Sequence, residues 1–126
     1  MEKSVVFFTK DISPEGLVKL YEKLGIKLDG KVAVKLHSGE EGNQNYVKPE
    51  FVKPIIEFVN GTVVECNTAY DGARNSTEKH KELMERHGWS KYFDVDIMDA
   101  DGEITLEVPN GHIILKDTLW VDLVEH

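Results

Sequence analysis

A lysine and a histidine two residues apart are the first side chains in this sequence whose types and spacing suit chemistry. Lys35 and His37 lie in an alternating apolar run, so on a strand they project from the same face. A lysine on a sheet face is costly to bury unless it meets an anion or opens to a cleft. We therefore expect a cationic pair that holds a ligand carboxylate, a phosphate or the carboxylate of Glu65. The alternatives are a purely structural pair with Glu65 and an edge strand with a solvated face.

The loop that follows, residues 39–47, is rich in glycines and carboxylates. Gly39 and Gly42 allow positive backbone φ angles, so the loop up to Asn43 can form a nest of N–H groups for an anion. It lacks the spacing of a P-loop or a dinucleotide fingerprint. Its two glutamates would repel a bare phosphate, but a hard metal ion that bridges carboxylates to a substrate removes this conflict. The candidate metal ligands are His37, Glu40 and Glu65, and the alternative is a solvated acidic turn.

A second polar loop, residues 67–77, follows the next apolar run. Arg74 precedes a predicted helix, where its charge and the helix dipole can bind an anionic group, or where it can pair with an acid. Tyr70 can stack on a ligand, hydrogen-bond to it or simply pack. Cys66 can act as a nucleophile beside His37, although single cysteines are more often small buried hydrophobes. His80 lies on an apolar helix face and is expected to pack rather than to bind a ligand.

The elements that must position these loops alternate between strand-like and helical patterns. Runs of β-branched, aromatic and alternating residues predict strands at residues 4–9, 31–38, 62–66 and 93–97. Capping residues and prolines predict helices that begin at Ser13-Pro14, at Pro49 and at Asn75, the last with Glu78 in capping-box spacing.

The C-terminal part of the sequence predicts further β structure. Two strands, 103–108 and 112–115, are expected to form a hairpin around Pro109-Asn110-Gly111. The tail 117–126 is amphipathic and fits either a strand or a helix.

This order, βαβαβα followed by a strand and a β-hairpin, predicts a single α/β domain over residues 1–126. We expect a three-layer-like domain with a mainly parallel central sheet and right-handed crossovers. Ligands of open α/β sheets bind beyond the carboxyl ends of the strands. The two polar loops should therefore converge at one edge and enclose one site, and the functional interpretation depends on that convergence.

Composition limits the classes of partner. The chain has 126 residues, 15 basic against 23 acidic side chains and a formal net charge of −8. No Lys/Arg cluster offers the basic face that nucleic acid or an anionic membrane requires. The N-terminus lacks the pattern of a signal peptide, so we expect a cytoplasmic protein. A single cysteine cannot supply the four ligands that an iron–sulfur cluster usually takes, so we expect no cluster in this chain.

Two blocks of the sequence resemble a known family. Residues 32–43, VAVKLHSGEEGN, are similar to the "VAIKIHFGEPGN" opening of the domain-of-unknown-function 362 family, and residues 65–77 with His80 are similar to its second block. Many members are longer and carry ferredoxin-like four-iron cluster motifs toward the C-terminus. The resemblance therefore implies the N-terminal portion of a longer protein. It transfers no reaction, but it implies a pocket made of Lys35, His37, Gly39, Glu40, Gly42, Asn43, Glu65, Asn67, Tyr70, Gly72, Arg74, Thr77 and His80.

The leading functional hypothesis is a redox-linked or metal-assisted enzyme that acts on a small anionic molecule. Lys35 and Arg74 would hold the anion, and His37 would transfer protons because histidine titrates near neutral pH. Glu65 and Glu40 would orient the imidazole or bind a divalent cation. The alternative is an accessory module without activity of its own. It would form a homo-oligomer or dock to an iron–sulfur partner or a missing domain through the apolar residues of the C-terminal segment 119–124.

Overall fold

The helices of the computed structural model begin close to the local signals in the sequence. The structure describes residues 3–101, 104–107 and 118–121. Helix α1 (Pro14–Glu22) follows Ser13, whose hydroxyl accepts a hydrogen bond from the Gly16 N–H at 2.9 Å. Helix α2 (Pro49–Phe58) also begins at a proline and continues through Pro54. Both starts agree with the preference for proline in the first turn, where its missing N–H costs nothing.

Helix α3 (Thr77–Arg86) begins one residue later than predicted. Its N-cap is Ser76, whose Oγ accepts a hydrogen bond from the Lys79 N–H at 3.5 Å. The predicted capping box of Asn75 and Glu78 is therefore wrong. The Asn75 side chain instead donates to Asp71 Oδ1 at 2.8 Å, because it belongs to the preceding loop.

Three short parallel strands form the central sheet. Strands β1 (Val32–Lys35), β2 (Gly61–Glu65) and β3 (Asp96–Ile97) lie in the order β1-β2-β3. In this register Lys35 pairs with Val64, and Glu65 pairs with Ile97. Helix α2 connects β1 to β2, and α3 with the 3-10 turn η1 (Trp89–Lys91) connects β2 to β3. The prediction of an α/β fold with a parallel sheet is confirmed.

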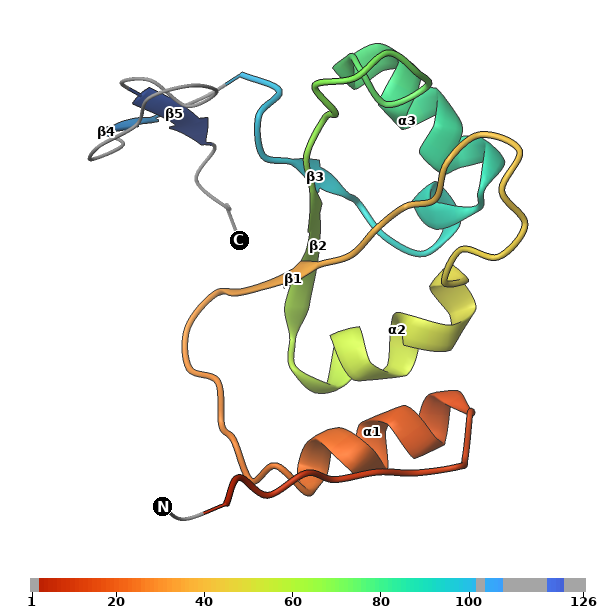
Figure 1. The fold of residues 1–126 in the computed structure, drawn as a ribbon, viewed down its shortest axis with the longest axis vertical. Coiled ribbons are helices and arrows are strands. Elements are labelled where there is room, and N and C mark those ends of the chain that lie inside the picture. Colours follow the sequence, from red (N-terminus) through yellow and green to blue (C-terminus); the bar gives the residue numbers. More distant parts are fainter. Residues whose placement is uncertain (1–2, 102–103, 108–117, 122–126) are drawn as a thin grey trace.

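The apolar core lies between this sheet and the helices on one side of it. Buried side chains from α2, β2, α3, η1 and β3 form one cluster, namely Val52, Ile56, Val63, Met84, Trp89 and Ile97. Figure 1 shows α2 and α3 on the same side of the strands, as right-handed crossovers between consecutive neighbouring strands require. Helix α1 packs on α2 rather than on the opposite face.

The predicted strand at residues 4–9 is wrong. The described sheet starts at Val32, and the backbone around the N-terminal run makes no ladder. Val5, Val6 and Phe8 are 78%, 85% and 80% exposed. Strand propensity describes how a side chain suits a pleated surface, and without a neighbouring backbone it does not produce a strand.

The C-terminal hairpin has a later second strand than predicted. Strand β4 (Ile104–Glu107) pairs antiparallel with β5 (Thr118–Val121) in a separate two-stranded sheet. The tail therefore contains a strand. The predicted turn 109–111 and strand 112–115 lie outside the described residues. Within the part of the chain that the structure describes, no helix has the length and apolar composition needed to cross a bilayer.

Candidate functional site

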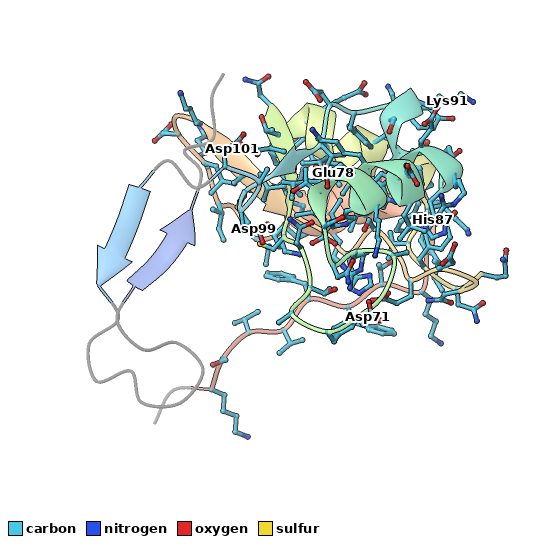
Figure 2. The ribbon with its side chains drawn as sticks, turned by 90° about the horizontal axis from the view of Figure 1, so that it is seen from above. Asp71, Glu78, His87, Lys91, Asp99 and Asp101 are labelled. Atoms are coloured by element: carbon cyan, nitrogen blue, oxygen red, sulfur yellow. The ribbon has the colours of Figure 1, made fainter. Side chains whose placement is uncertain are left out.

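The two polar loops meet at the carboxyl edge of the sheet because β1 and β2 are parallel neighbours. Lys35 Nζ at the end of β1 lies 2.5 Å from Glu65 Oε2 at the end of β2. His37 Nε2 lies 3.0 Å from Nη2 of Arg74, which belongs to the second loop. Figure 2 looks down on this edge, with Asp71 on the loop between β2 and α3 and His87 at the end of α3. The expected convergence of the two segments is therefore present.

Glu65 is the buried centre of the site, with 2% of its surface exposed. Its Oε2 accepts from Lys35 Nζ and from the Cys66 N–H, the latter at 3.0 Å. Its Oε1 accepts from the Ser38 N–H and from Arg74 Nη1, each at 3.0 Å. Burial alone would raise the pKa of Glu65, but the hydrogen bonds from Lys35, Ser38 and Cys66 outweigh it and lower the pKa. Glu65 is therefore a buried anion that its hydrogen bonds to Lys35, Ser38 and Cys66 keep ionised.

Arg74 bridges this buried carboxylate to a second one near the surface. Its side chain is 5% exposed, and it spans from Glu65 to Glu40, with Nη2 at 2.5 Å and Nε at 3.1 Å from Glu40 Oε1. Burial alone would lower the pKa of Arg74, but the hydrogen bonds to Glu40 and Tyr70 raise it. A guanidinium with a carboxylate on each side is satisfied in charge and geometry.

Glu40 presents a single oxygen to three donors. Its Oε1 accepts from Arg74 Nε, from Arg74 Nη2 and from the hydroxyl of Tyr70 at 2.6 Å. The hydrogen bond from Tyr70, followed by that from Arg74, holds the pKa of Glu40 below its ordinary value. Glu40 is 38% exposed, so this contact lies at the outer rim of the site.

His37 is also at the rim, and its ring is oriented by the backbone. Its Nδ1 accepts a hydrogen bond from the Gly39 N–H at 3.0 Å, so a neutral imidazole carries its proton on Nε2. Nε2 points toward the charged groups, 3.0 Å from Arg74 Nη2 and 3.7 Å from Glu40 Oε1. His37, Arg74 and Glu40, three of the side chains that the sequence singled out, therefore lie together here.

Behind Glu65 lies a chain of polar side chains, of which sequence reasoning missed Ser38. Asn67 Nδ2 donates to Thr77 Oγ1 at 3.0 Å, so Asn67 Oδ1 is the acceptor that faces His80 Nδ1 at 3.3 Å. The Ser38 hydroxyl lies 2.9 Å from His80 Nε2 and 3.3 Å from Glu65 Oε1, so it links the imidazole to the buried carboxylate. Burial lowers the pKa of His80, which favours the neutral ring. The prediction that His80 packs is confirmed, and its partner Ser38 had no distinguishing signal except its place at the strand end.

The order serine, histidine and asparagine resembles that of a nucleophile relay, but the space around it is filled. Ser38 is buried, and Val63, Met84 and Trp89 line the space beside it without room for a water molecule. A nucleophile needs an accessible oxygen beside the reacting carbon. The chain of hydrogen bonds therefore ties β1, β2 and α3 together and does not form a reaction site.

The start of the first loop is held tightly. The Ser38 carbonyl accepts from Trp89 Nε1 and His87 Nδ1, each at 3.0 Å. Gly39 has φ +97°, and an added Cβ would lie 2.7 Å from the ring of Tyr46, which stacks on His87 with centroids 4.2 Å apart. Figure 1 shows this loop running beside α3. The backbone at Gly39 is therefore fixed by close packing that a side chain would prevent.

Several predicted site residues lie outside the central cluster. Gly42 and Gly72 have open space around them. Asn43 is engaged within its own loop, where its Oδ1 accepts from the Asn45 N–H at 2.8 Å. Burial and the charge of Asp99 raise the pKa of the Cys66 thiol, which opposes a thiolate nucleophile.

The proposed metal ligands do not converge on one point. In the described part of the chain, no group of three His, Cys, Asp or Glu residues is arranged to hold a metal ion. The guanidinium of Arg74 instead bridges Glu40 and Glu65. A divalent ion bound by both carboxylates would have to displace this cation.

The comparisons with known proteins give a family and nothing closer. No curated protein and no solved structure matches the chain. The model of one family, described as Domain of unknown function (DUF362), matches residues 32–125, which include both loops of the site. The chain therefore belongs to the DUF362 family.

Proposed function

We propose that the carboxyl edge of the sheet binds a small anionic molecule, with Lys35 and Arg74 as the cations and His37 as the proton-transfer group. The observation that carries the proposal is that the ammonium of Lys35 and the imidazole of His37 are about half exposed and lie beside the buried, ionised side chains of Glu65 and Arg74. The Lys35 side chain is 51% exposed, and it donates to the Leu36 carbonyl and to Glu65. An ammonium has three protons, so one remains for a ligand.

The charges of the site support an anion rather than a cation as ligand. Lys35 and Arg74 balance the two carboxylates Glu40 and Glu65, so the cluster is neutral when His37 is neutral. A proton on His37 would make the cluster positive. The neutral imidazole carries its proton on Nε2 and can donate it to a bound anion, because the Gly39 N–H already orients the ring. Membership in the DUF362 family is consistent with this hypothesis but names no substrate.

The test is a titration of the protein with inorganic phosphate, acetate and malonate at low salt, followed by NMR chemical shifts of the backbone amides. We expect shifts centred on residues 35–40 and 70–74. Lys35→Gln and His37→Gln should each weaken binding about tenfold, because each removes a charged or oriented donor. Lys53→Gln is the matched control, since Lys53 pairs with Glu57 on the exposed side of α2.

Unchanged affinity in both site variants would refute the proposal. A parallel titration with Mg²⁺ and Zn²⁺ tests the metal-assisted form of the hypothesis. Divalent binding that Glu65→Gln abolishes, in the absence of any anion binding, would favour a metal site in which Arg74 has moved.

A second candidate, an interaction module, is favoured by the exposed N-terminal side chains. Val5, Val6, Phe8 and Ile12 lie within eight residues of sequence and are all largely exposed. Clusters of exposed apolar side chains mark contact surfaces more often than isolated ones do. The partner implied by the family resemblance is an iron–sulfur protein or a further domain. Light scattering across a range of concentrations tests self-association, and Val6→Asp should abolish any dimer found. A monomer at every concentration with no anion binding would leave neither candidate supported.

A further inference from the structure

The contact between Glu40 and Arg74 joins a partly exposed carboxylate to a buried guanidinium. Arg74 is held on one side by Glu65, a carboxylate that is almost fully buried and receives two backbone N–H groups. On the other side it is held by Glu40, which is more than one-third exposed. One partner of the guanidinium is therefore fixed, and the other can leave without opening the core.

Glu40 does not meet the donors of the second loop in the arrangement that suits a carboxylate best. Nε and Nη2 of Arg74 form one edge of a planar fork, which suits a carboxylate that places one oxygen on each nitrogen. Glu40 instead places a single oxygen, Oε1, against Nε, Nη2 and the Tyr70 hydroxyl. In the described part of the chain its other oxygen, Oε2, accepts no hydrogen bond. A free carboxylate can make the two-oxygen arrangement that Glu40 does not make in this structure.

The backbone at Glu40 is fixed, so only its side chain can move. Gly39 is packed against Tyr46 and His87, and the Glu40 carbonyl accepts from the Asn43 N–H at 3.1 Å. A rotation about the side-chain bonds of Glu40 would expose the Nε edge of Arg74 and the Tyr70 hydroxyl. The loop itself need not open.

We propose that Glu40 occupies the position of a ligand carboxylate, and that a small carboxylate binds to Arg74 and Tyr70 by displacing the Glu40 side chain. This inference rests on the proposed anion site and names its ligand class. A monoanionic carboxylate preserves the charge that Arg74 now meets, whereas a phosphate dianion would add a second negative charge beside the ionised Glu65.

The experiment measures acetate affinity by NMR in the wild-type protein and in Glu40→Ala, with the side-chain Nε–H signal of Arg74 as the direct probe. Removal of the competing carboxylate should tighten acetate binding by on the order of tenfold. Glu41→Ala is the matched control, because it removes the same charge from the next residue. Glu41 pairs outward with Arg86 at 3.2 Å, so its loss should change acetate affinity by less than about twofold.

Three outcomes are decisive. Acetate that binds Glu40→Ala no tighter than Glu41→Ala overturns the displacement, and the proposed anion site still stands if Lys35→Gln weakens binding. An absence of binding to wild type and to every variant overturns both. Phosphate that gains as much as acetate in Glu40→Ala overturns the assignment to carboxylates. If Glu40→Ala does not fold, Glu40→Gln provides the same comparison with the shape retained, and its acetate affinity should lie between wild type and the value expected for the alanine variant.

Discussion

Replacement of Glu65 by glutamine tests whether the buried network is the structural centre of the domain. Glu65→Gln keeps the size of the side chain but removes its charge and turns one acceptor into a donor. The amide would then point at Lys35 Nζ, the Cys66 N–H or Arg74 Nη1, all of which are donors in the folded protein. Breaking a buried ion pair by removing one partner costs about 3–5 kcal/mol. Because Arg74 retains Glu40, we expect the lower end, about 3 kcal/mol.

The assay is urea unfolding followed by circular dichroism at pH 7, with linear extrapolation to water. A loss of about 3 kcal/mol is a large part of the roughly 5–15 kcal/mol by which domains are usually stable. Glu57→Gln is the control, because Glu57 forms an exposed pair with Lys53 one turn away on α2. That pair is expected to contribute about 0.3–0.5 kcal/mol. A cost for Glu65→Gln below about 1 kcal/mol would refute the reasoning, since it would show that the network does not depend on this charge.

The same variant has a pH signature. The folded protein lowers the pKa of Glu65 below its ordinary value of 4.5, so the ionised group stabilises the folded state above that value. This contribution is lost as pH falls through the folded pKa. The wild-type free energy of unfolding should therefore decline more steeply between about pH 5 and pH 3 than that of Glu65→Gln. Parallel slopes for the two proteins would show that folding does not change the pKa of Glu65.

Three further predictions follow from single contacts. Gly39→Ala should lower the free energy of unfolding by on the order of 3 kcal/mol, because its Cβ would meet the ring of Tyr46 at a positive φ. Gly42→Ala, at a positive φ but in open space, should lower it by about 1 kcal/mol. Equal urea midpoints of the two variants would contradict the packing of the loop. Burial lowers the pKa of His80 below 6.5, so the unfolded state binds the extra proton and the free energy of unfolding falls as pH drops below that value. His80→Gln should flatten the pH dependence of the free energy of unfolding in this range, and an unchanged slope would show that folding does not lower the pKa of His80. Burial raises the pKa of the Cys66 thiol above 9.0, so iodoacetamide should alkylate it more slowly at pH 7.5 than it alkylates free cysteine. An equal rate of alkylation, measured by mass spectrometry, would contradict a shielded thiol.

The helix starts could be predicted because their causes are local. Ser13 and the prolines at the starts of α1 and α2 act within one turn of their own backbone. The exact start of α3 could not, because Asn75 and Ser76 both fit a cap. The loop contact between Asn75 and Asp71 decided between them.

The candidate site was only partly visible in the sequence. The expectation that Lys35 meets Glu65 follows from parallel strands and residue spacing alone. The bridge made by Arg74 does not, because it depends on how residues 67–76 fold back over the sheet edge. Ser38 was hidden as well, because its role comes from a hydrogen bond to His80 across 42 residues of sequence. Asn67 was expected in the pocket, but its contact with His80 was not.

By itself, the sequence determined the alternation of helices and strands and the edge of the sheet that would carry polar chemistry, because periodicity, caps and strand direction are properties of neighbouring residues. Only the tertiary structure decided which carboxylate is buried and which lies at the rim. It also brought the guanidinium of Arg74 between the two. It also left the apolar run at residues 4–9 outside the sheet. These outcomes depend on which segments, distant in the sequence, come together in the fold. Desolvation and ion pairing act on their side chains only after folding has brought these segments into contact.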